Sequence, residues 1–313
     1  MSARAETIAG GGNAAVAPGF LGRAFAGRTG PVIVVCVAIL VIWYVAAVWL
    51  NAPFQRDMDQ RRDVTRTTSE FIAATLSQPK PTLPAPHQVA IDVWNTTALA
   101  NPVKPSSLLF HVWVTLSSTL VGFVLGTFLG ILLAIGIIHL KSLEKSLMPW
   151  IISSQTIPIL AIAPMVIVVL AAIRVTGLIP KAFISTYLSF FPVTVGMVKG
   201  FRSPEPIHLD LMRTYNSSPW QVFWKLRVPA SVPFLFTSMK VAIAASLVGA
   251  IVAELPTGAV AGIGSRLLIG AYYSQSVQIW SALVAGSIMA GLLVAAVGVL
   301  QRIVTRRMGA RPA

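Results

Sequence analysis

Charged residues are scarce in this chain. Only 11% of its 313 residues are Asp, Glu, Lys or Arg, whereas 55% are hydrophobic, and this balance excludes an ordinary soluble globular protein. Several apolar runs reach or exceed the roughly 20 residues that cross a bilayer core of about 30 Å. The sequence therefore predicts an all-α, polytopic protein of the lipid bilayer.

Cysteine is limited to one residue, and clustered histidines and nucleotide-binding glycine motifs are missing. The single Cys36 excludes disulfides and cysteine-ligated metal. The four histidines are scattered, and neither H-E-x-x-H nor a G-x-x-x-x-G-K-[ST] loop is present. We therefore expect no catalytic residues, no metal and no cofactor. A membrane protein of this kind is a channel, a gradient-driven carrier or one part of a larger machine.

Acidic residues are few, and the formal net charge is +14. Nucleic acid is one interpretation of this excess, but in a membrane protein Lys and Arg mark the cytoplasmic loops, so we expect no nucleic-acid partner. Of the 24 Lys and Arg, 14 fall in the N-terminal tail, the 139–146 turn, the 199–227 loop and the C-terminal tail. This distribution predicts that both termini are cytoplasmic.

Six apolar segments divide the chain. Residues 1–30 are rich in Gly and Ala and predict a mostly disordered cytoplasmic tail. Residues 51–107 predict a periplasmic segment with a surface helix at 56–70, and residues 306–313 predict a second cytoplasmic tail. The expected transmembrane helices are 31–50, 108–138, 147–173, 181–201, 234–255 and 280–301. The first is long enough to span the bilayer, so we expect a retained anchor rather than a cleaved signal peptide.

Small residues and prolines inside the spans predict how they pack. Gly122, Gly126 and Gly130 are spaced by four, which lets another helix approach closely in lipid. Pro158 and Pro164 predict that the third span is kinked or broken. Residues 256–279, between the last two spans, are expected to form a Gly-rich external loop, and within it Gly262-Ile-Gly264 is a weak phosphate-binding candidate.

Polar residues at membrane depth are candidates for a translocation pathway. Ser153, Gln155 and Thr156 lie beside Pro158, and two interpretations remain open for them: lining a pathway, or hydrogen bonding between helices. Glu254, near the external end of the fifth span, either lines a gate or caps its helix. Lys240 in the same span is expected to reach the cytoplasmic edge.

The stretch 203–233 is the longest polar interruption in the C-terminal two-thirds of the chain, and it predicts two short helices joined by a tight turn. Ser203 is expected to cap the first helix. Asn216 is expected to end that helix in a left-handed conformation. Ser218 and Gln221 predict a capping box at the second. Three aromatic residues of the second helix share one face: Trp220, Phe223 and Trp224.

This stretch resembles the cytoplasmic loop of type I ABC importer permeases, whose pattern is Glu-Ala-Ala, three residues, Gly, nine residues, Ile-x-Leu-Pro. The residues at those positions, with the spacing kept, are Asp210-Leu211-Met212, Asn216, Leu226 and Val228-Pro229. Leu211 and Met212 are larger than the two alanines, which indicates an altered fit to a partner. Other segments resemble the nitrate/sulfonate/taurine subgroup: Arg213-Thr-Tyr, Gln155-Thr-Ile-Pro158, and Gly262-Ile-Gly264 after Glu254. The resemblance covers roughly residues 83–305.

The resemblance implies the permease subunit of an ATP-driven importer in a bacterial inner membrane, with a permease core at 108–305 and coupling helices at about 205–229. It implies two cytoplasmic ATP-binding subunits, a periplasmic substrate-binding protein and a second permease subunit, identical or not. The cargo would be a nitrate-, sulfonate- or taurine-like molecule, a pyrimidine or a vitamin precursor. ATP hydrolysis would belong to the partners, so this chain would not be an enzyme. The residues expected to dock an ATP-binding subunit are Asp210, Arg213, Asn216, Trp220, Phe223, Trp224 and Lys225.

Three alternatives compete with this interpretation. A gradient-driven secondary carrier usually shows paired discontinuous helices in two repeat halves, and no internal repeat is evident here. A membrane enzyme acting on lipid would need clustered His, Asp or Glu at the interface. The 203–233 stretch itself also fits a loop lying on its own subunit or on lipid headgroups, with its aromatic residues in the interfacial belt.

Overall fold

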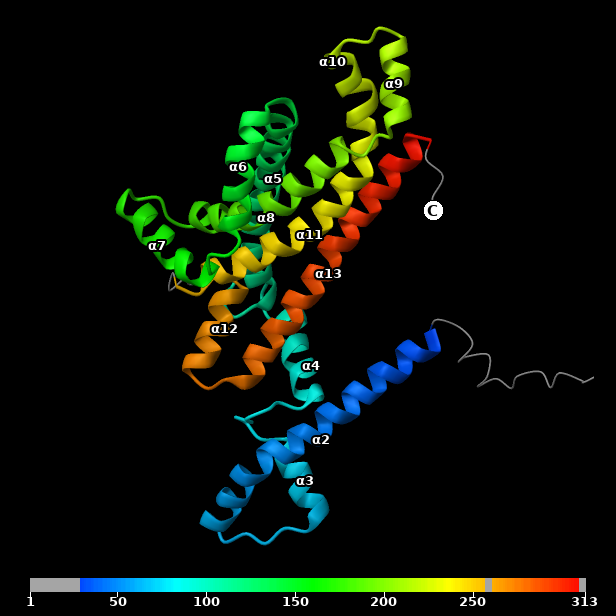
Figure 1. The fold of residues 1–313 in the computed structure, drawn as a ribbon. Helices are drawn as coiled ribbons and strands as arrows, with labels where there is room; N and C mark the ends of the chain where they lie inside the picture. Colours follow the sequence, from blue (N-terminus) through cyan, green and yellow to red (C-terminus); the bar gives the residue numbers. More distant parts are fainter. Residues whose placement is uncertain (1–28, 257–260, 310–313) are drawn as a thin grey trace, which may run out of the picture. The chain divides into compact units, whose positions relative to one another are not determined.

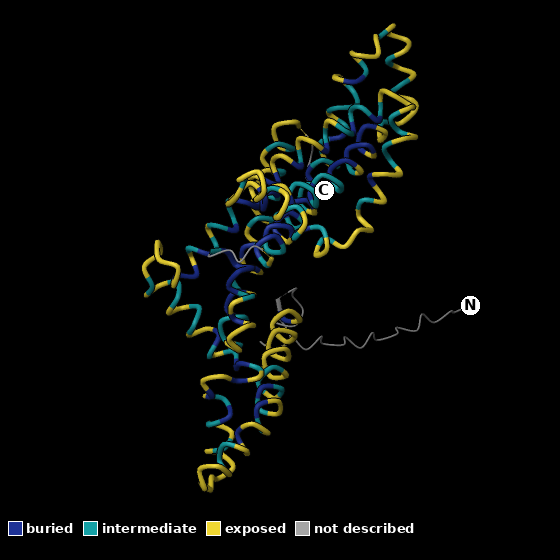
Figure 2. The backbone as a smooth tube through the Cα atoms, turned by 90° about the vertical axis from the view of Figure 1, so that its left-hand side faces the viewer, coloured by how far each residue is buried: buried dark blue, intermediate teal, exposed yellow. Residues whose placement is uncertain are grey.

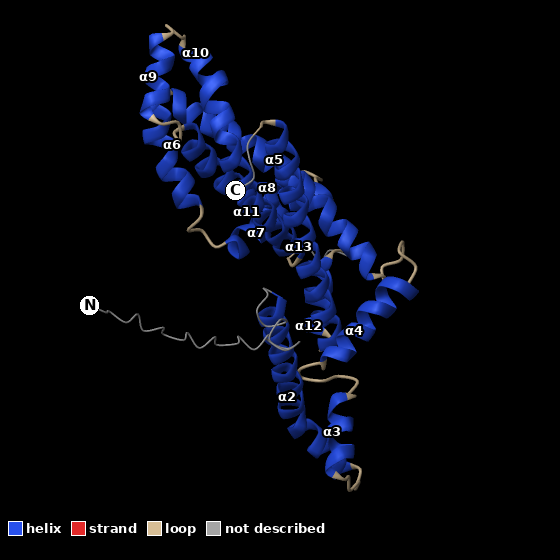
Figure 3. Cartoon of the chain, turned by 90° about the vertical axis from the view of Figure 1, so that its right-hand side faces the viewer, coloured by secondary structure: helices blue, strands red, loops and turns tan. Residues whose placement is uncertain are grey.

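The computed structural model describes residues 29–256 and 261–309, and within them the chain forms helices and loops, without a strand (Figure 3). The all-α prediction is therefore confirmed. The chain divides into two units, Met1–Leu76 and Ser77–Ala313. The predictions made for residues 1–28 and 310–313, in the two terminal tails, lie outside the described residues.

The first unit contains α2 (Thr29–Arg61) and α3 (Thr68–Leu76), which pack against each other. Most of the apolar side chains of α2 between residues 32 and 45 are exposed, as suits a helix surrounded by lipid. The helix passes through Pro53 and ends at Arg61, well beyond the expected residue 50. The predicted surface helix at 56–70 is thus wrong in its bounds, since its first part continues α2 and its last part begins α3.

The second unit contains the remaining helices. In chain order they are α4 (Pro86–Trp94), the π-helical turn η1 (Asn95–Leu99), α5 (Leu108–His139), α6 (Lys141–Ser154), α7 (Ile159–Ala172), α8 (Leu178–Phe201), α9 (Pro206–Thr214), α10 (Pro219–Val222), the π-helical turn η2 (Phe223–Arg227), α11 (Val228–Glu254), α12 (Ile263–Tyr272) and α13 (Ser276–Arg307). Figure 1 shows α8, α11 and α13 running along one another, and α8 also packs against α5. Their shared interior is the buried core of this unit (Figure 2).

Five described helices are long and apolar enough to cross a membrane, and they become six if the bent pair α6–α7 is one span. The two helices of that pair meet at 99°, which confirms the predicted break in the third span. Pro158 is the N-cap of α7 and carries no N–H, so it cannot continue α6. The Tyr187 hydroxyl of α8 donates to the Ser154 carbonyl at the end of α6, which satisfies an acceptor that the break leaves free.

The close approach predicted by the glycine spacing occurs between α5 and α8. A methyl group added at Gly122 would overlap the Ser185 Cβ and lie 2.9 Å from the Ala182 carbonyl oxygen. Gly126 and Gly130 face Ser189 and Val193 in the same way. Because lipid tails are as apolar as the helices, such backbone contact, rather than the hydrophobic effect, holds membrane helices together.

Three other expectations about element ends differ from the structure. The first helix of the 203–233 stretch begins at Pro206, so the N-cap position belongs to Glu205, which makes no side-chain cap hydrogen bond, and not to Ser203. The fifth span does not start at 234, because η2 and α11 continue α10 without a break from residue 219. The external loop 256–279 contains the ten-residue helix α12.

The α5–α8 contact makes a quantitative prediction for Gly122→Ala. The added methyl group has no room, and overfilling a packed core costs about 1–3 kcal/mol. We expect thermal unfolding of the detergent-solubilised protein to occur at a clearly lower temperature.

Gly291→Ala is the matched control, because Gly291 lies inside α13 with no neighbouring atom within 4 Å of an added Cβ. This change is expected to be neutral, or to stabilise by up to about 0.5–1 kcal/mol through helix propensity. Equal unfolding temperatures for the two variants would contradict the close helix approach.

Candidate functional site

The α9–α10 hairpin protrudes from one end of the second unit (Figure 1). Asn216 turns the chain between its helices with φ at +47°, the left-handed conformation predicted for it. Ser218 then caps α10: its side chain accepts from the Gln221 amide at 3.3 Å, and the Gln221 side chain accepts from the Ser218 amide at 2.9 Å. The predicted capping box is therefore confirmed, and the geometry of the turn is determined by its own residues.

The three aromatic residues of the second helix are not equivalent. Trp220 is 66% exposed and Trp224 is 51% exposed, whereas Phe223 is only 3% exposed. The Phe223 ring packs against Phe201 and His139, with centroid distances of 5.3 and 4.9 Å. Trp220 and Trp224 stack edge to face, 5.5 Å apart. Phe223 therefore anchors the second helix to the bundle, while the two tryptophans present apolar surface outward.

A second exposed apolar stripe lies on α9. Ile207, Leu211 and Tyr215 recur every four residues and are all exposed, although an apolar stripe with this period normally faces a core. The sequence pattern assigns no role to Ile207, and Tyr215 enters it only within the Arg213-Thr-Tyr segment. Together with the two tryptophans, these residues form what we call the hairpin surface: Ile207, Leu211, Tyr215, Trp220 and Trp224.

The charged residues predicted for docking also lie on the hairpin. The Arg213 guanidinium is 3.0 Å from the Asp210 carboxylate, one helical turn earlier. Both side chains are strongly exposed, and an exposed pair of this kind contributes little to stability. Lys225 is exposed as well. These charges are thus free to interact with another molecule at little cost to the fold.

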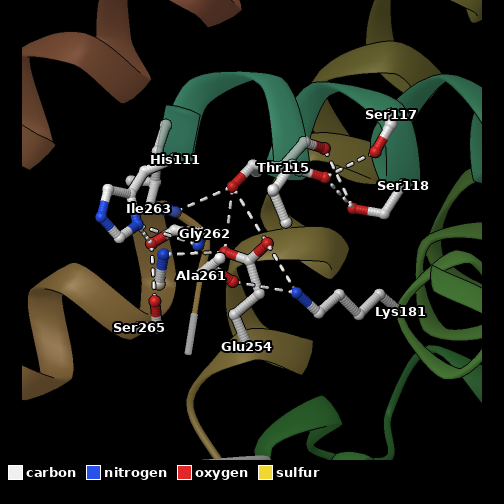
Figure 4. A network of polar contacts seen from close by, with 12 residues as sticks. His111, Thr115, Ser117, Ser118, Lys181, Glu254, Ala261, Gly262, Ile263 and Ser265 are labelled. Atoms are coloured by element: carbon white, nitrogen blue, oxygen red, sulfur yellow. Dashed lines mark hydrogen bonds and ion pairs between the residues drawn. The ribbon is translucent and has the colours of Figure 1, made fainter. Parts of the chain in front are cut away.

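A second polar cluster surrounds Glu254, the last residue of α11 (Figure 4). Its carboxylate is fully buried and accepts hydrogen bonds from the Thr115 hydroxyl at 3.0 Å and from the Gly264 amide at 2.8 Å. The Lys181 ammonium lies 3.4 Å from the same carboxylate and donates to the Ala261 carbonyl at 3.1 Å. Glu254 therefore ties α5, α8 and the start of α12 to the end of α11.

The chain around Gly262 is shaped to fit this carboxylate. Gly262 has a φ of +129°, and a methyl group there would overlap the Glu254 carboxylate. His111 closes the other side: its Nδ1 lies 3.0 Å from the Gly262 amide, and its Nε2 lies 2.8 Å from the Pro105 carbonyl. The positive N-terminal end of α12 thus receives a carboxylate from the protein itself, so the Gly262-Ile-Gly264 segment, a weak phosphate candidate by sequence, is occupied.

The four residues predicted for a pathway do not form one site. Ser153, Gln155 and Thr156 are exposed at the α6–α7 break, and the Thr156 hydroxyl bonds back to the Ser153 carbonyl at 2.7 Å. Glu254 is buried in its own network. Lys181, the ionic partner of Glu254, was not among the predicted residues, although the sequence holds a signal: Lys181 is a lone Lys at the start of one predicted span, and Glu254 is a lone acid at the end of another.

Comparison with known proteins places the chain among transport components. The sequence profile of the family described as "Binding-protein-dependent transport system inner membrane component" matches residues 126–310. A probable ABC transporter permease protein of Haemophilus influenzae is 30% identical over 50% of this chain. That match covers 62% of the relative, so the chain spans less than two thirds of its length.

Other relatives are matched over more of their length. The formylaminopyrimidine transport permease protein of Halalkalibacterium halodurans is 31% identical over 62% of this chain and 73% of its own. The riboflavin transport system permease protein of Chloroflexus aurantiacus is 28% identical over 72% and 80%. A putative aliphatic sulfonates permease of Bacillus subtilis (24%, over 64% and 71%) and a nitrate import permease of Synechocystis sp. (27%, over 70% and 76%) also match.

The Glu254 network predicts strong coupling between Glu254 and Lys181. Glu254→Gln keeps the shape of the side chain but leaves the Lys181 ammonium buried without a counter-charge. In the same way, Lys181→Met leaves the Glu254 carboxylate buried without a counter-charge. Removing one partner of a buried ion pair costs about 3–5 kcal/mol. We expect each single variant to lower the free energy of unfolding by an amount of this order.

The double variant Glu254→Gln/Lys181→Met tests whether the pair itself is the cause. It should lose less than the sum of the single losses, with a coupling of about 0.5–3 kcal/mol. Denaturant unfolding of all four proteins in one detergent measures this cycle, and strictly additive losses would show that the two charges do not interact.

Proposed function

The chain belongs to the family of binding-protein-dependent transport system inner-membrane components, and on that premise we propose that it forms the membrane pathway of an ATP-driven importer. Its relatives are permeases of ABC transporters, including those named for sulfonate and nitrate import, in agreement with the sequence resemblance. The observation that carries the proposal is the hairpin surface, which presents apolar side chains where the bundle ends.

The hairpin surface is the proposed docking site for a cytoplasmic ATP-binding subunit. Trp220 and Trp224 are of the residue type that most often dominates interface affinity. Asp210, Arg213 and Lys225 surround them with charges that select the partner and its orientation. Asn216 and Phe223 act indirectly in this proposal, because one turns the hairpin and the other holds it to the bundle.

The proposed assembly has two such ATP-binding subunits, a second permease subunit and a periplasmic substrate-binding protein. ATP binding would favour one arrangement of the ATP-binding pair, and the docked hairpins would transmit that preference to the membrane helices, as coupling between two states requires. ATP hydrolysis belongs to the partners. The excess of Lys and Arg near the hairpin and both tails supports a cytoplasmic location for all three, in a bacterial inner membrane.

The proposed orientation also gives each remaining segment a location. Residues 51–107 would be periplasmic, and 108–305 would form the permease core. Ser153, Gln155 and Thr156 are proposed to line the pathway, because the broken span exposes them. Glu254 is proposed to shape the external end of the pathway by holding the chain around Gly262. The cargo is a small molecule, either an oxyanion such as nitrate or a sulfonate, or a heterocycle such as a pyrimidine or flavin.

Trp224→Ala, alone and with Trp220→Ala, tests the docking surface. Truncating a dominant interface residue costs about 2 kcal/mol or more, which corresponds to roughly 30-fold in affinity. We expect the affinity for the ATP-binding subunit to fall by at least that factor, while membrane insertion is unchanged. The measurement is a titration of the purified permease with its co-expressed ATP-binding subunit.

Trp94→Ala is the matched control, since Trp94 is equally exposed but lies on α4, outside the hairpin. It should bind the ATP-binding subunit like the unaltered protein. Normal binding by the Trp220/Trp224 double variant would move the docking surface elsewhere. The alternative function, a gradient-driven carrier, is tested in proteoliposomes: uptake that ignores internal ATP and is abolished by proton and sodium ionophores would replace the importer proposal.

A further inference from the structure

A cavity of about 560 Å³ opens between α5, α7 and α8. Its volume falls within the roughly 300–1,000 Å³ typical of small-molecule sites. We call it the α5–α8 cavity. Its wall is mainly apolar and includes Trp113, Val114, Ser117, Ile167, Ala171 and Lys181.

Part of the polar wall belongs to the Glu254 network, because Lys181 and Ala261 both line the cavity and bond to each other beside Glu254 (Figure 4). Ser117 and Thr176 line the cavity as well, outside that network. The Lys181 side chain is only 6% exposed. Its ammonium carries three N–H groups, and among residues 29–256 and 261–309 Glu254 and the Ala261 carbonyl account for two of them, which leaves one for another acceptor. The Ser117 hydroxyl donates to the Val114 carbonyl at 2.8 Å, and its oxygen can still accept.

The cavity wall has no net charge to offer an anion. The positive charge of Lys181 is cancelled by Glu254. Among the described residues, the other buried cation near this network, Arg266, has Asp92 as its carboxylate partner at 3.9 Å. An anion that formed an ion pair with Lys181 in place of Glu254 would leave the Glu254 carboxylate buried without a counter-charge. Burying a charge without a counter-charge is strongly unfavourable.

We infer that the α5–α8 cavity binds an uncharged, planar heterocycle, whose ring carbonyl or ring nitrogen accepts the remaining N–H of Lys181 and whose face lies on Trp113. The inference rests on the proposed import function and chooses between its two cargo chemistries. A planar ring matches the flat, exposed indole of Trp113. A ring N–H of the cargo meets the acceptor oxygen of Ser117. The acyl chain of a lipid would fill the apolar part of the cavity but would leave the Lys181 N–H without an acceptor.

Direct binding to the permease–ATPase complex in lipid nanodiscs tests this inference. The probes are riboflavin and a formylaminopyrimidine as uncharged heterocycles, and nitrate and ethanesulfonate as anions. Equilibrium dialysis against each probe should show saturable binding of at least one heterocycle and of neither anion. Trp113→Ala should weaken that binding by about two- to tenfold, because it removes the aromatic face.

Two neighbouring alanines give a matched pair of variants. Ala171 lines the cavity, whereas Ala172, the last residue of α7, is exposed but does not line it. Ala171→Phe fills the cavity and should weaken heterocycle binding by about tenfold or more. Ala172→Phe places the same side chain one position further along the chain and should leave the affinity unchanged.

Each other outcome overturns the inference in a recognisable way. Binding of nitrate or ethanesulfonate that Ala171→Phe abolishes would assign the cavity to an anion. A lipid retained by the unaltered protein and lost from Ala171→Phe, seen by native mass spectrometry, would assign it to an acyl chain. No saturable binding of either heterocycle rejects the site altogether. The proposed function is tested separately, by measuring the association of the ATP-binding subunit and the rate of ATP hydrolysis in the same complex.

Discussion

A carboxylate removed from water must receive hydrogen bonds or a counter-charge, and Glu254 receives both. This one requirement accounts for residue choices scattered over the chain. Thr115 supplies a hydroxyl and Lys181 supplies an ammonium, and Gly262 leaves the space that the carboxylate fills. The start of α12 is placed where its Gly264 amide donates to the same carboxylate. Without this carboxylate, α5, α8, α11 and α12 would lose the group to which all four are bonded.

The helices α5, α8 and α11 are held together by close contact between their backbones. Glycine and serine line the contacts of α8 with α5 and α11, so the backbones approach closely. Serine hydroxyls also bond between these three helices: Ser189 of α8 donates to the Gly122 carbonyl of α5 at 3.1 Å, and Ser246 of α11 donates to the Thr119 carbonyl of α5 at 2.8 Å. In lipid, both kinds of contact replace the hydrophobic effect. Many other large apolar side chains are left on the outside, where the surrounding lipid solvates them.

Local chemistry made some features predictable and left others hidden. The glycine spacing, the break at Pro158, the turn at Asn216 and the cap at Ser218 each depend on a few neighbouring residues, and the structure has them all. The Lys181–Glu254 pair joins residues 73 positions apart, which only the folded bundle brings together.

The aromatic residues of the hairpin show a second limit of the sequence. Helical spacing correctly placed Phe223 beside Trp220 and Trp224, but the Phe201 and His139 rings from other helices decide that Phe223 alone is covered. The exposed stripe of Ile207, Leu211 and Tyr215 is not predictable from the sequence for the opposite reason. An apolar period of four normally indicates a core face, and no local signal says that this one faces outward.

The unbroken helical run from Pro219 to Glu254 has a mechanical consequence. Its 36 residues make a rod of about 54 Å at 1.5 Å per residue. One end carries Trp220 and Trp224, and the other end carries the Glu254 carboxylate. No loop interrupts this run, although the π-helical turn η2 and Pro233 lie within it, so a movement imposed on the tryptophans passes to the carboxylate along one continuous helical path. In the proposed complex, the contact of an ATP-binding subunit with one end would therefore be connected to the chain around Gly262 at the other end through a single helical segment.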